Sequence, residues 1–108
     1  MVATHDRSRP VIIGAISAAT GDCKDAVKRI LDGAIKVDVL IGDYLAEINL
    51  AWRKAEMDAN PEVGYDPTFI QCLQVASKEL KQRLDEGNFP KFVVNTGGLN
   101  PRGMATKV

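Results

Sequence analysis

Three short apolar runs along the chain are each followed by glycine and polar residues. They occupy residues 11–13, 37–41 and 91–95, and branched or aromatic side chains fill most of their positions. Short runs of this composition, bounded by turn residues, are typical of buried strands. Because a helical pattern follows each polar stretch, the sequence predicts a chain of successive strand–helix units.

Apolar residues at helical spacing predict the helices that follow these strands. Asp22 is the expected N-cap of the first helix, with Asp25 at its third position. A second helix is expected over residues 44–59, and a third begins after Asp66 with Pro67 at its first position. The apolar stripe of the second helix comprises Leu45, Ile48, Trp52 and Ala55, and the buried stripe of the third comprises Phe69, Cys72, Leu73, Ala76, Leu80 and Leu84.

The alternation of strands and helices predicts a three-layer α/β fold with a parallel sheet, at the start of a doubly wound domain. The start of an α/β barrel is the alternative. Residues 1–9 are polar and are expected to form a disordered tail. A further helix starts at Asn100 and Pro101, but seven residues follow Pro101 and Gly103 weakens that turn. Residues 10–108 are therefore expected to be the incomplete N-terminal part of a larger domain, marginally stable alone.

Charge and composition exclude several kinds of partner. The chain has 14 basic and 14 acidic residues, so charge gives no reason to expect nucleic acid or a membrane surface as a partner. No apolar run reaches the ~18 residues of a membrane helix, and residues 1–9 contain no signal-peptide core. Cys23 and Cys72 lie far apart without a CxxC pair, as expected for reduced thiols. The cytoplasm is the default location, by elimination.

Acidic residues at the expected helix starts are candidates for catalysis. Asp22, Asp43 and Glu47 are the proposed catalytic residues, because a spacing of four would place Asp43 and Glu47 on one face of a helix. Such carboxylates could serve acid–base chemistry or hold a divalent metal together with Asp22 or Asn95. Plain helix capping for the aspartates and a solvated position for Glu47 are the alternatives. The sequence identifies neither a metal nor a cofactor.

A glycine-rich stretch after the third strand is a candidate ligand loop. Two glycines permit tight turns and close approach of backbone N–H groups to a ligand, and a structural turn is the alternative. Neither GxGxxG nor a Walker A motif is present, and the single histidine, His5, leaves no Ser/His/Asp set. The expected ligand-binding residues are Gly21, Asn95, Gly97, Gly98, Asn100 and Arg102.

Three sequence blocks resemble the N-terminal part of the acyclic terpene utilisation protein A family. They are IGAISAATGD at residues 13–22, VDVLIGDYLAE at 37–47 and VVNTGGLNPRG at 93–103. The chain departs from the family pattern at Ile48, Asn49 and Thr96, none of which is acidic. The matching positions are Gly21, Asp22, Asp43, Glu47, Asn95, Gly97, Gly98, Asn100 and Pro101.

This resemblance implies a family of much longer proteins linked to degradation of acyclic terpenes such as citronellol and geraniol. It carries no catalytic roles for individual residues. A small terpenoid or acyl-type ligand is the implied partner, and homo-oligomerisation of a full-length form is left open. A non-catalytic ligand-binding or scaffold module, or an inactive truncated product, is the alternative function.

Overall fold

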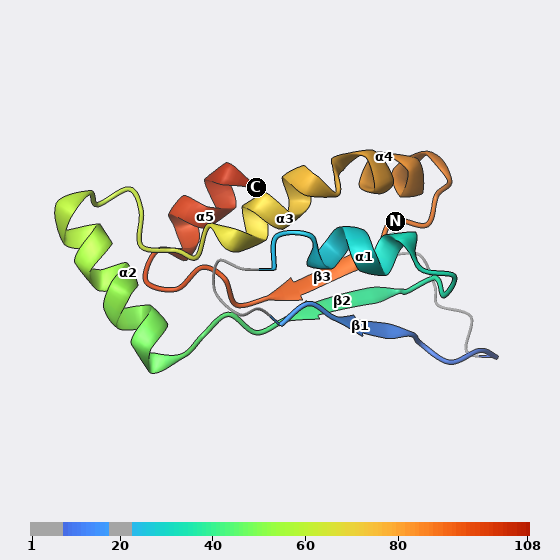
Figure 1. Cartoon of the computed structure of the whole chain (residues 1–108), viewed down its shortest axis with the longest axis horizontal. Helices are drawn as coiled ribbons and strands as arrows, with labels where there is room; N and C mark the ends of the chain where they lie inside the picture. Colours follow the sequence, from blue (N-terminus) through green and yellow to red (C-terminus); the bar gives the residue numbers. More distant parts are fainter. Residues whose placement is uncertain (1–7, 18–22) are drawn as a thin grey trace.

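A computed structural model describes residues 8–17 and 23–108 as a small parallel sheet with helices (Figure 1). The elements follow the predicted order of strands and helices, except that two helices occupy the range of the predicted third helix. The elements are β1 (Ile13–Ala15), α1 (Ala26–Asp32), β2 (Val39–Gly42), α2 (Glu47–Ala59), α3 (Thr68–Val75), α4 (Ser77–Asp85), β3 (Lys91–Val94) and α5 (Pro101–Lys107).

The three described strands form one parallel sheet in the order β1-β2-β3. Leu40 of β2 pairs with Gly14 of β1 and Phe92 of β3, and Gly42 pairs with Val94. All strands run the same way, so their carboxyl ends meet at one edge, which in Figure 1 points toward α2. The parallel α/β fold predicted from the strand–helix alternation is therefore confirmed, and the sheet is open.

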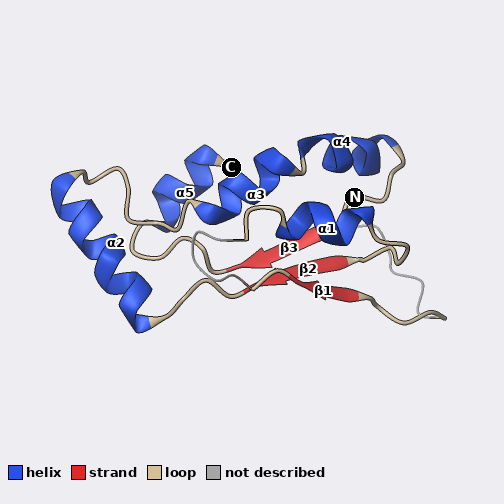
Figure 2. Cartoon of the chain, in the orientation of Figure 1, coloured by secondary structure: helices blue, strands red, loops and turns tan. Residues whose placement is uncertain are grey.

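One face of this sheet is covered by α1, α3, α4 and α5 (Figure 2). Leu40 is fully buried beneath these helices, together with Val27 of α1 and Cys72 of α3. Phe69 of α3 packs edge-on against Phe92 of β3, with ring centroids 5.7 Å apart. Burying side chains of this size stabilises the fold by roughly 1.5–3 kcal/mol each, so this contact between helices and sheet forms the core.

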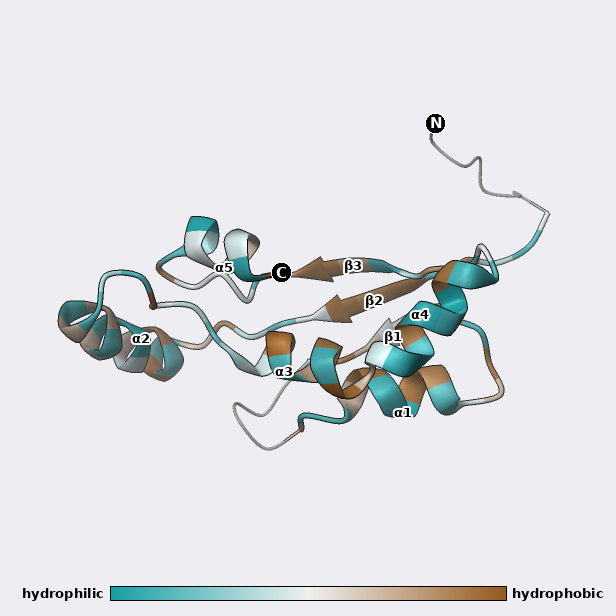
Figure 3. Ribbon diagram, turned by 90° about the horizontal axis from the view of Figure 1, so that it is seen from above, coloured by the Kyte–Doolittle hydropathy of each residue, from teal (hydrophilic) through white to brown (hydrophobic). Residues whose placement is uncertain are grey.

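The opposite face of the sheet is bare of helices in the described part of the chain. Ile13, Ile41 and Val93 point to this face and are 56 %, 39 % and 59 % exposed. Apolar residues occupy both faces of the strands, and Figure 3 shows β2 and β3 in brown along most of their lengths. Strands of this composition are typical of sheets covered on both sides, as in three-layer folds.

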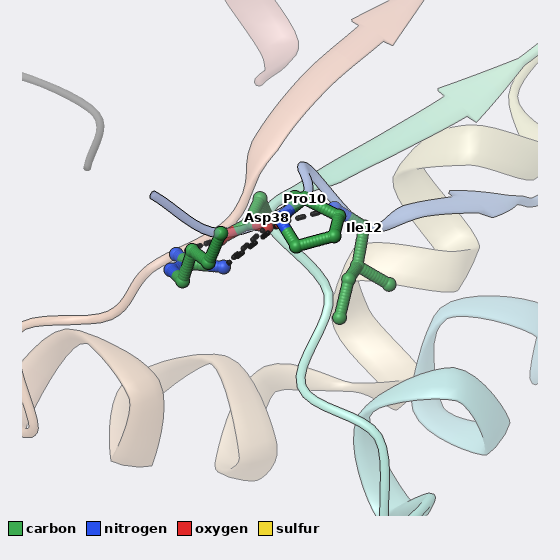
Figure 4. A network of polar contacts seen from close by, with 4 residues as sticks. Pro10, Ile12 and Asp38 are labelled. Atoms are coloured by element: carbon green, nitrogen blue, oxygen red, sulfur yellow. Dashed lines mark hydrogen bonds and ion pairs between the residues drawn. The ribbon is translucent and has the colours of Figure 1, made fainter. Parts of the chain in front are cut away.

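A polar network holds the start of β1 against β2 at the amino end of the sheet (Figure 4). The guanidinium of Arg9 donates to both carboxylate oxygens of Asp38, over 3.1 and 2.7 Å. The backbone N–H of Ile12 donates to Asp38 Oδ2 over 2.8 Å. Asp38, the one polar residue in its predicted strand, thus fixes the entry of the chain into the sheet.

Several predicted helix details are wrong. The first helix begins at Ala26, so Asp25 precedes it instead of occupying its third position. The predicted third helix is divided at Ala76 into α3 and α4, and Leu84 at its end is exposed. The chain does form a helix after Asn100, because the Asn100 side chain accepts a hydrogen bond from the N–H of Gly103.

The second predicted helix differs more. It begins at Glu47 instead of Tyr44, and none of its residues is buried. Its apolar stripe faces solvent, since Leu45, Ile48 and Trp52 are all exposed. The half-buried side chains of α2 are instead Asn49, Leu50, Arg53 and Met57.

Candidate functional site

Two loops that follow neighbouring strands bring polar side chains together at the carboxyl edge of the sheet. Because Gly42 pairs with Val94, the next residues along each strand, Asp43 and Asn95, lie opposite each other. The Nδ2 group of Asn95 donates to Oδ1 of Asp43 over 2.8 Å. The sequence named both residues as site candidates, and the parallel register brings them into contact.

Further hydrogen bonds fix the orientation of this pair. The Oδ1 atom of Asn95 accepts the backbone N–H of Tyr44 over 2.7 Å, so both ends of the amide are engaged. The N–H of Asp43 donates to Oγ of Ser17, at the end of β1, over 3.2 Å. We call Ser17, Asp43 and Asn95 the edge cluster, because they come from the ends of all three strands.

The carboxylate of Asp43 is held in its charged form. Hydrogen bonds from the Asn95 side chain and from the N–H of Leu45 lower the pKa of Asp43 below its ordinary value of 3.8. Both bonds go to Oδ1, and Oδ2 accepts no hydrogen bond within the described residues. Asp43 is an exposed residue, so Oδ2 can accept a hydrogen bond from a ligand, whereas a lowered pKa makes Asp43 a poor proton donor.

Glu47, the other proposed catalytic carboxylate within the described residues, does not join this contact. Asp22 and Gly21 lie outside the described residues. Glu47 is the exposed first residue of α2, and Asp43 precedes that helix. The argument that a spacing of four places Asp43 and Glu47 on one helical face is therefore wrong. Asp43 does not cap α2 either; its carboxylate accepts the N–H two residues ahead, in a turn typical of aspartate.

The glycine-rich loop after β3 is built by tight packing against other parts of the chain. Gly98 has φ +52°, and a Cβ atom there would lie 2.8 Å from the carbonyl oxygen of Gly64. A Cβ atom at Gly97 would lie 2.7 Å from Cα of Pro101. Tight packing therefore explains why both positions are glycine, and this explanation does not require a ligand.

The remaining predicted ligand-binding residues are Asn100 and Arg102, and they differ in whether their side chains are available to bind a ligand. The Nδ2 group of Asn100 lies 3.1 Å from the carbonyl oxygen of Val63 and within hydrogen-bond distance of those of Pro61 and Glu62. Its Oδ1 atom caps α5, so the whole amide is used within the protein. Arg102 is exposed on α5 and could meet an anionic group.

Sequence reasoning missed a buried polar group beneath the edge cluster. Thr96 is 3 % exposed; its hydroxyl donates to the carbonyl oxygen of Asp66, and its own carbonyl accepts the N–H of Asp66, both over 2.9 Å. Tyr44 packs nearby against Phe69, and burial raises the pKa of its hydroxyl far above the ordinary value. Side chains alternate between the two faces of a sheet along an extended chain. Tyr44 and Thr96 each follow an edge-cluster residue and therefore face the helices, so this alternation could have identified both residues.

An apolar pocket of about 450 Å³ opens between α3, β3 and α5. Thr96 and Gly97 of the glycine-rich loop line one end, so the pocket adjoins the loop that carries Asn95. Its volume falls within the ~300–1,000 Å³ usual for small-molecule sites. The apolar side chains that line it include Phe69, Leu73, Phe89, Phe92, Val94 and Met104.

The described residues offer no obvious metal site and no membrane helix. No group of three or more His, Cys, Asp or Glu residues within 8–17 and 23–108 is arranged to hold a metal ion. In the same residues, no helix has both the length and the apolar character needed to cross a bilayer. The edge cluster itself offers one carboxylate, one amide and one hydroxyl.

Comparison with known proteins gives one match. The sequence model of a family described as "Acyclic terpene utilisation family protein AtuA" matches residues 11–108. No curated protein and no solved structure matches significantly. The match covers all the described strands and helices, including both loops of the Asp43–Asn95 contact.

Proposed function

Because the chain belongs to the acyclic terpene utilisation family AtuA, we propose that it contributes a binding site for an acyclic terpenoid alcohol of the citronellol or geraniol type. Such a molecule has a flexible apolar chain and one hydroxyl group. A site for it needs an apolar groove and a hydrogen-bond acceptor. Thr96 and Gly97 line the apolar pocket and follow directly after Asn95, which contacts the acceptor Asp43 from the neighbouring loop.

The observation that carries this proposal is the Oδ2 atom of Asp43, which accepts no hydrogen bond from the residues that the structure describes. The carboxylate is charged and oriented through Oδ1 alone, so Oδ2 can accept the hydroxyl proton of a ligand in a hydrogen bond. A hydrogen bond to a charged group contributes about 1.5–3 kcal/mol, enough to orient a small alcohol. With its lowered pKa, Asp43 acts as an acceptor and positions the ligand.

The apolar pocket supports the second half of the proposal. Three phenylalanine rings, Phe69, Phe89 and Phe92, form much of its wall, and few polar groups interrupt it. Burying an alkyl chain there would contribute about 0.8 kcal/mol per CH₂ group. The hydroxyl would extend beyond the end of the pocket lined by Thr96 and Gly97 to reach Asp43, which does not itself line the pocket, and the chain would extend toward α5.

The test is binding of geraniol and citronellol to the purified chain by calorimetry or ligand-observed NMR. Asp43→Asn keeps the Oδ1 acceptor and removes the charge, and we expect binding to weaken by about 10–100-fold, the equivalent of one charged hydrogen bond. Ala105→Phe fills the pocket from an exposed position on α5 and should abolish binding.

Two controls separate this proposal from general effects. Asp58→Asn removes an exposed carboxylate from α2, and it should leave binding unchanged. Equal binding of a saturated alkane without a hydroxyl group would contradict the role of Asp43. Binding that survives Ala105→Phe would contradict the pocket as the site.

A non-catalytic binding or scaffold module remains the second candidate. The observation that favours it is α2, which extends from the sheet edge with its apolar stripe exposed. Turnover of the terpenoid by a protein containing this chain, lost in Asp43→Asn with an unchanged circular dichroism spectrum, would favour the enzyme.

A further inference from the structure

The two cysteines of the chain lie on elements that pack against each other. Cys23 is located just before α1, and Cys72 lies in α3, which contacts α1. The thiol of Cys72 donates to the carbonyl oxygen of Cys23 over 3.3 Å, and Cys72 is fully buried. Both cysteines are free thiols in the structure. Although they lie 49 positions apart in sequence, this hydrogen bond brings them into direct contact.

The two thiols differ in accessibility and in their surroundings. Cys23 is partly exposed, and the Nη2 atom of Arg29 lies 3.0 Å from its Sγ atom. The guanidinium therefore places a positive charge beside the more accessible of the two sulfurs. Oδ2 of Asp25 lies 3.3 Å from Nε of the same guanidinium, and this ion pair keeps Arg29 in place beside the sulfur. Burial raises the pKa of Cys72 above its ordinary value of 9.0, which disfavours its thiolate.

The geometry places the sulfur of Cys72 close to the backbone of Cys23. A carbonyl oxygen lies about 2.4 Å from the Cα atom of its own residue, so Sγ of Cys72 lies within roughly 6 Å of Cα of Cys23. In a disulfide this separation is about 4 Å, and the two Cα atoms lie about 4.4–6.8 Å apart. Rotation of the Cys23 side chain away from Arg29, with a shift on the order of 2 Å, would complete the bond.

We propose that Cys23 and Cys72 are a redox-active pair, in which Cys23 attacks a small disulfide such as glutathione disulfide and Cys72 then closes an intramolecular bond. In the first step the Cys23 thiolate bonds to one glutathione sulfur, and the other leaves as a thiolate that takes up a proton. In the second step Cys72 loses its proton and attacks Cys23 Sγ, releasing the second glutathione as a thiol. Two protein thiols are oxidised, and one glutathione disulfide is reduced to two thiols.

The bond would tether the start of α1 to α3, the helix that supplies Phe69 to the apolar pocket. It closes a loop of 50 residues, counting both cysteines, and should raise the midpoint of thermal unfolding. The proposal does not depend on the terpenoid site, since it rests on the contact between the Cys72 thiol and the backbone carbonyl of Cys23.

The test is incubation of the reduced chain with glutathione disulfide, followed by intact-mass and peptide analysis. We expect loss of two hydrogen atoms per chain, no retained glutathione and a linked peptide containing Cys23 and Cys72, all reversed by dithiothreitol. Cys72→Ser should stop at a stable glutathione adduct on Cys23. Cys23→Ser should leave the buried Cys72 unmodified while the protein is folded.

Variants of the neighbouring cations test the order of attack. Arg29→Gln should slow the first step several-fold, and Arg29→Lys should restore part of the rate. Lys24→Gln removes a nearby exposed charge that does not contact the sulfur, so it should leave the rate unchanged. The proposal is overturned if the unaltered chain does not react, if it accumulates a stable adduct at Cys23, or if Cys72 reacts as fast in Cys23→Ser.

Discussion

At the scale of single residues, the behaviour of Asp43 depends on a neighbour 52 positions away in sequence. The amide of Asn95 donates to its carboxylate and accepts the N–H of Tyr44, so the amide can be satisfied only in this orientation. Sequence reasoning identified both residues as candidates, because each follows a strand. It assigned Asp43 to the wrong local structure, since a capping aspartate and an aspartate in a turn look the same in sequence.

The first prediction concerns the pKa of Asp43. Its carboxylate should titrate below 3.8 in the folded chain, and Asn95→Ala should raise its pKa toward that ordinary value, because the largest stabilising hydrogen bond is lost. The contribution of Asp43 to stability is present above its unfolded pKa and is lost as pH falls through the lower folded pKa. NMR titration of the Asp43 side-chain carbon measures the shift. An unchanged pKa in Asn95→Ala would show that the hydrogen bond does not set it.

At the scale of elements, α2 and α3 show what hydrophobic periodicity can and cannot predict. Both helices were predicted from apolar residues at helical spacing, and both form. The stripe of α3 is buried against α1 and the sheet, whereas the stripe of α2 faces solvent. Periodicity predicts that a helix has an apolar face, but the connections at its two ends decide whether that face meets the core.

The second prediction compares one large aromatic residue from each helix. Phe69→Ala should destabilise the fold by about 3–5 kcal/mol, because it leaves a cavity between Tyr44 and Phe92. Trp52→Ala should change stability by less than ~0.5 kcal/mol, since Trp52 is half exposed and α2 buries no residue. Urea unfolding measures both values. A large loss in Trp52→Ala would mean that α2 is packed in solution.

At the scale of the whole molecule, the sheet is covered on one face only in the described residues. Ile13, Ile41 and Val93 lie exposed on the other face, next to further branched residues of the strands. Parallel sheets are normally buried on both faces, and β3 is an edge strand with unpaired backbone groups.

The third prediction follows from that exposed face. Replacing Ile13, Ile41 and Val93 together by threonine should reduce self-association of the isolated chain, because it removes the apolar face and keeps β-branched side chains. Sedimentation velocity over a range of concentrations measures the change. A matched set at exposed positions away from this face, Ile35→Thr, Val75→Thr and Leu84→Thr, should have a smaller effect. Equal effects of the two sets would show that the exposed sheet face is not the surface through which the chain self-associates.

The chain sequence by itself determined the order of strands and helices, the parallel sheet and the polar loops at its carboxyl edge. These features follow from local patterns: branched apolar runs, helical spacing and the glycine and aspartate residues that end them. The Asp43–Asn95 contact, the exposed stripe of α2 and the meeting of Cys23 with Cys72 were decided by tertiary structure alone. Each depends on strand register or helix docking between distant segments, and no local pattern encodes which segments will be neighbours.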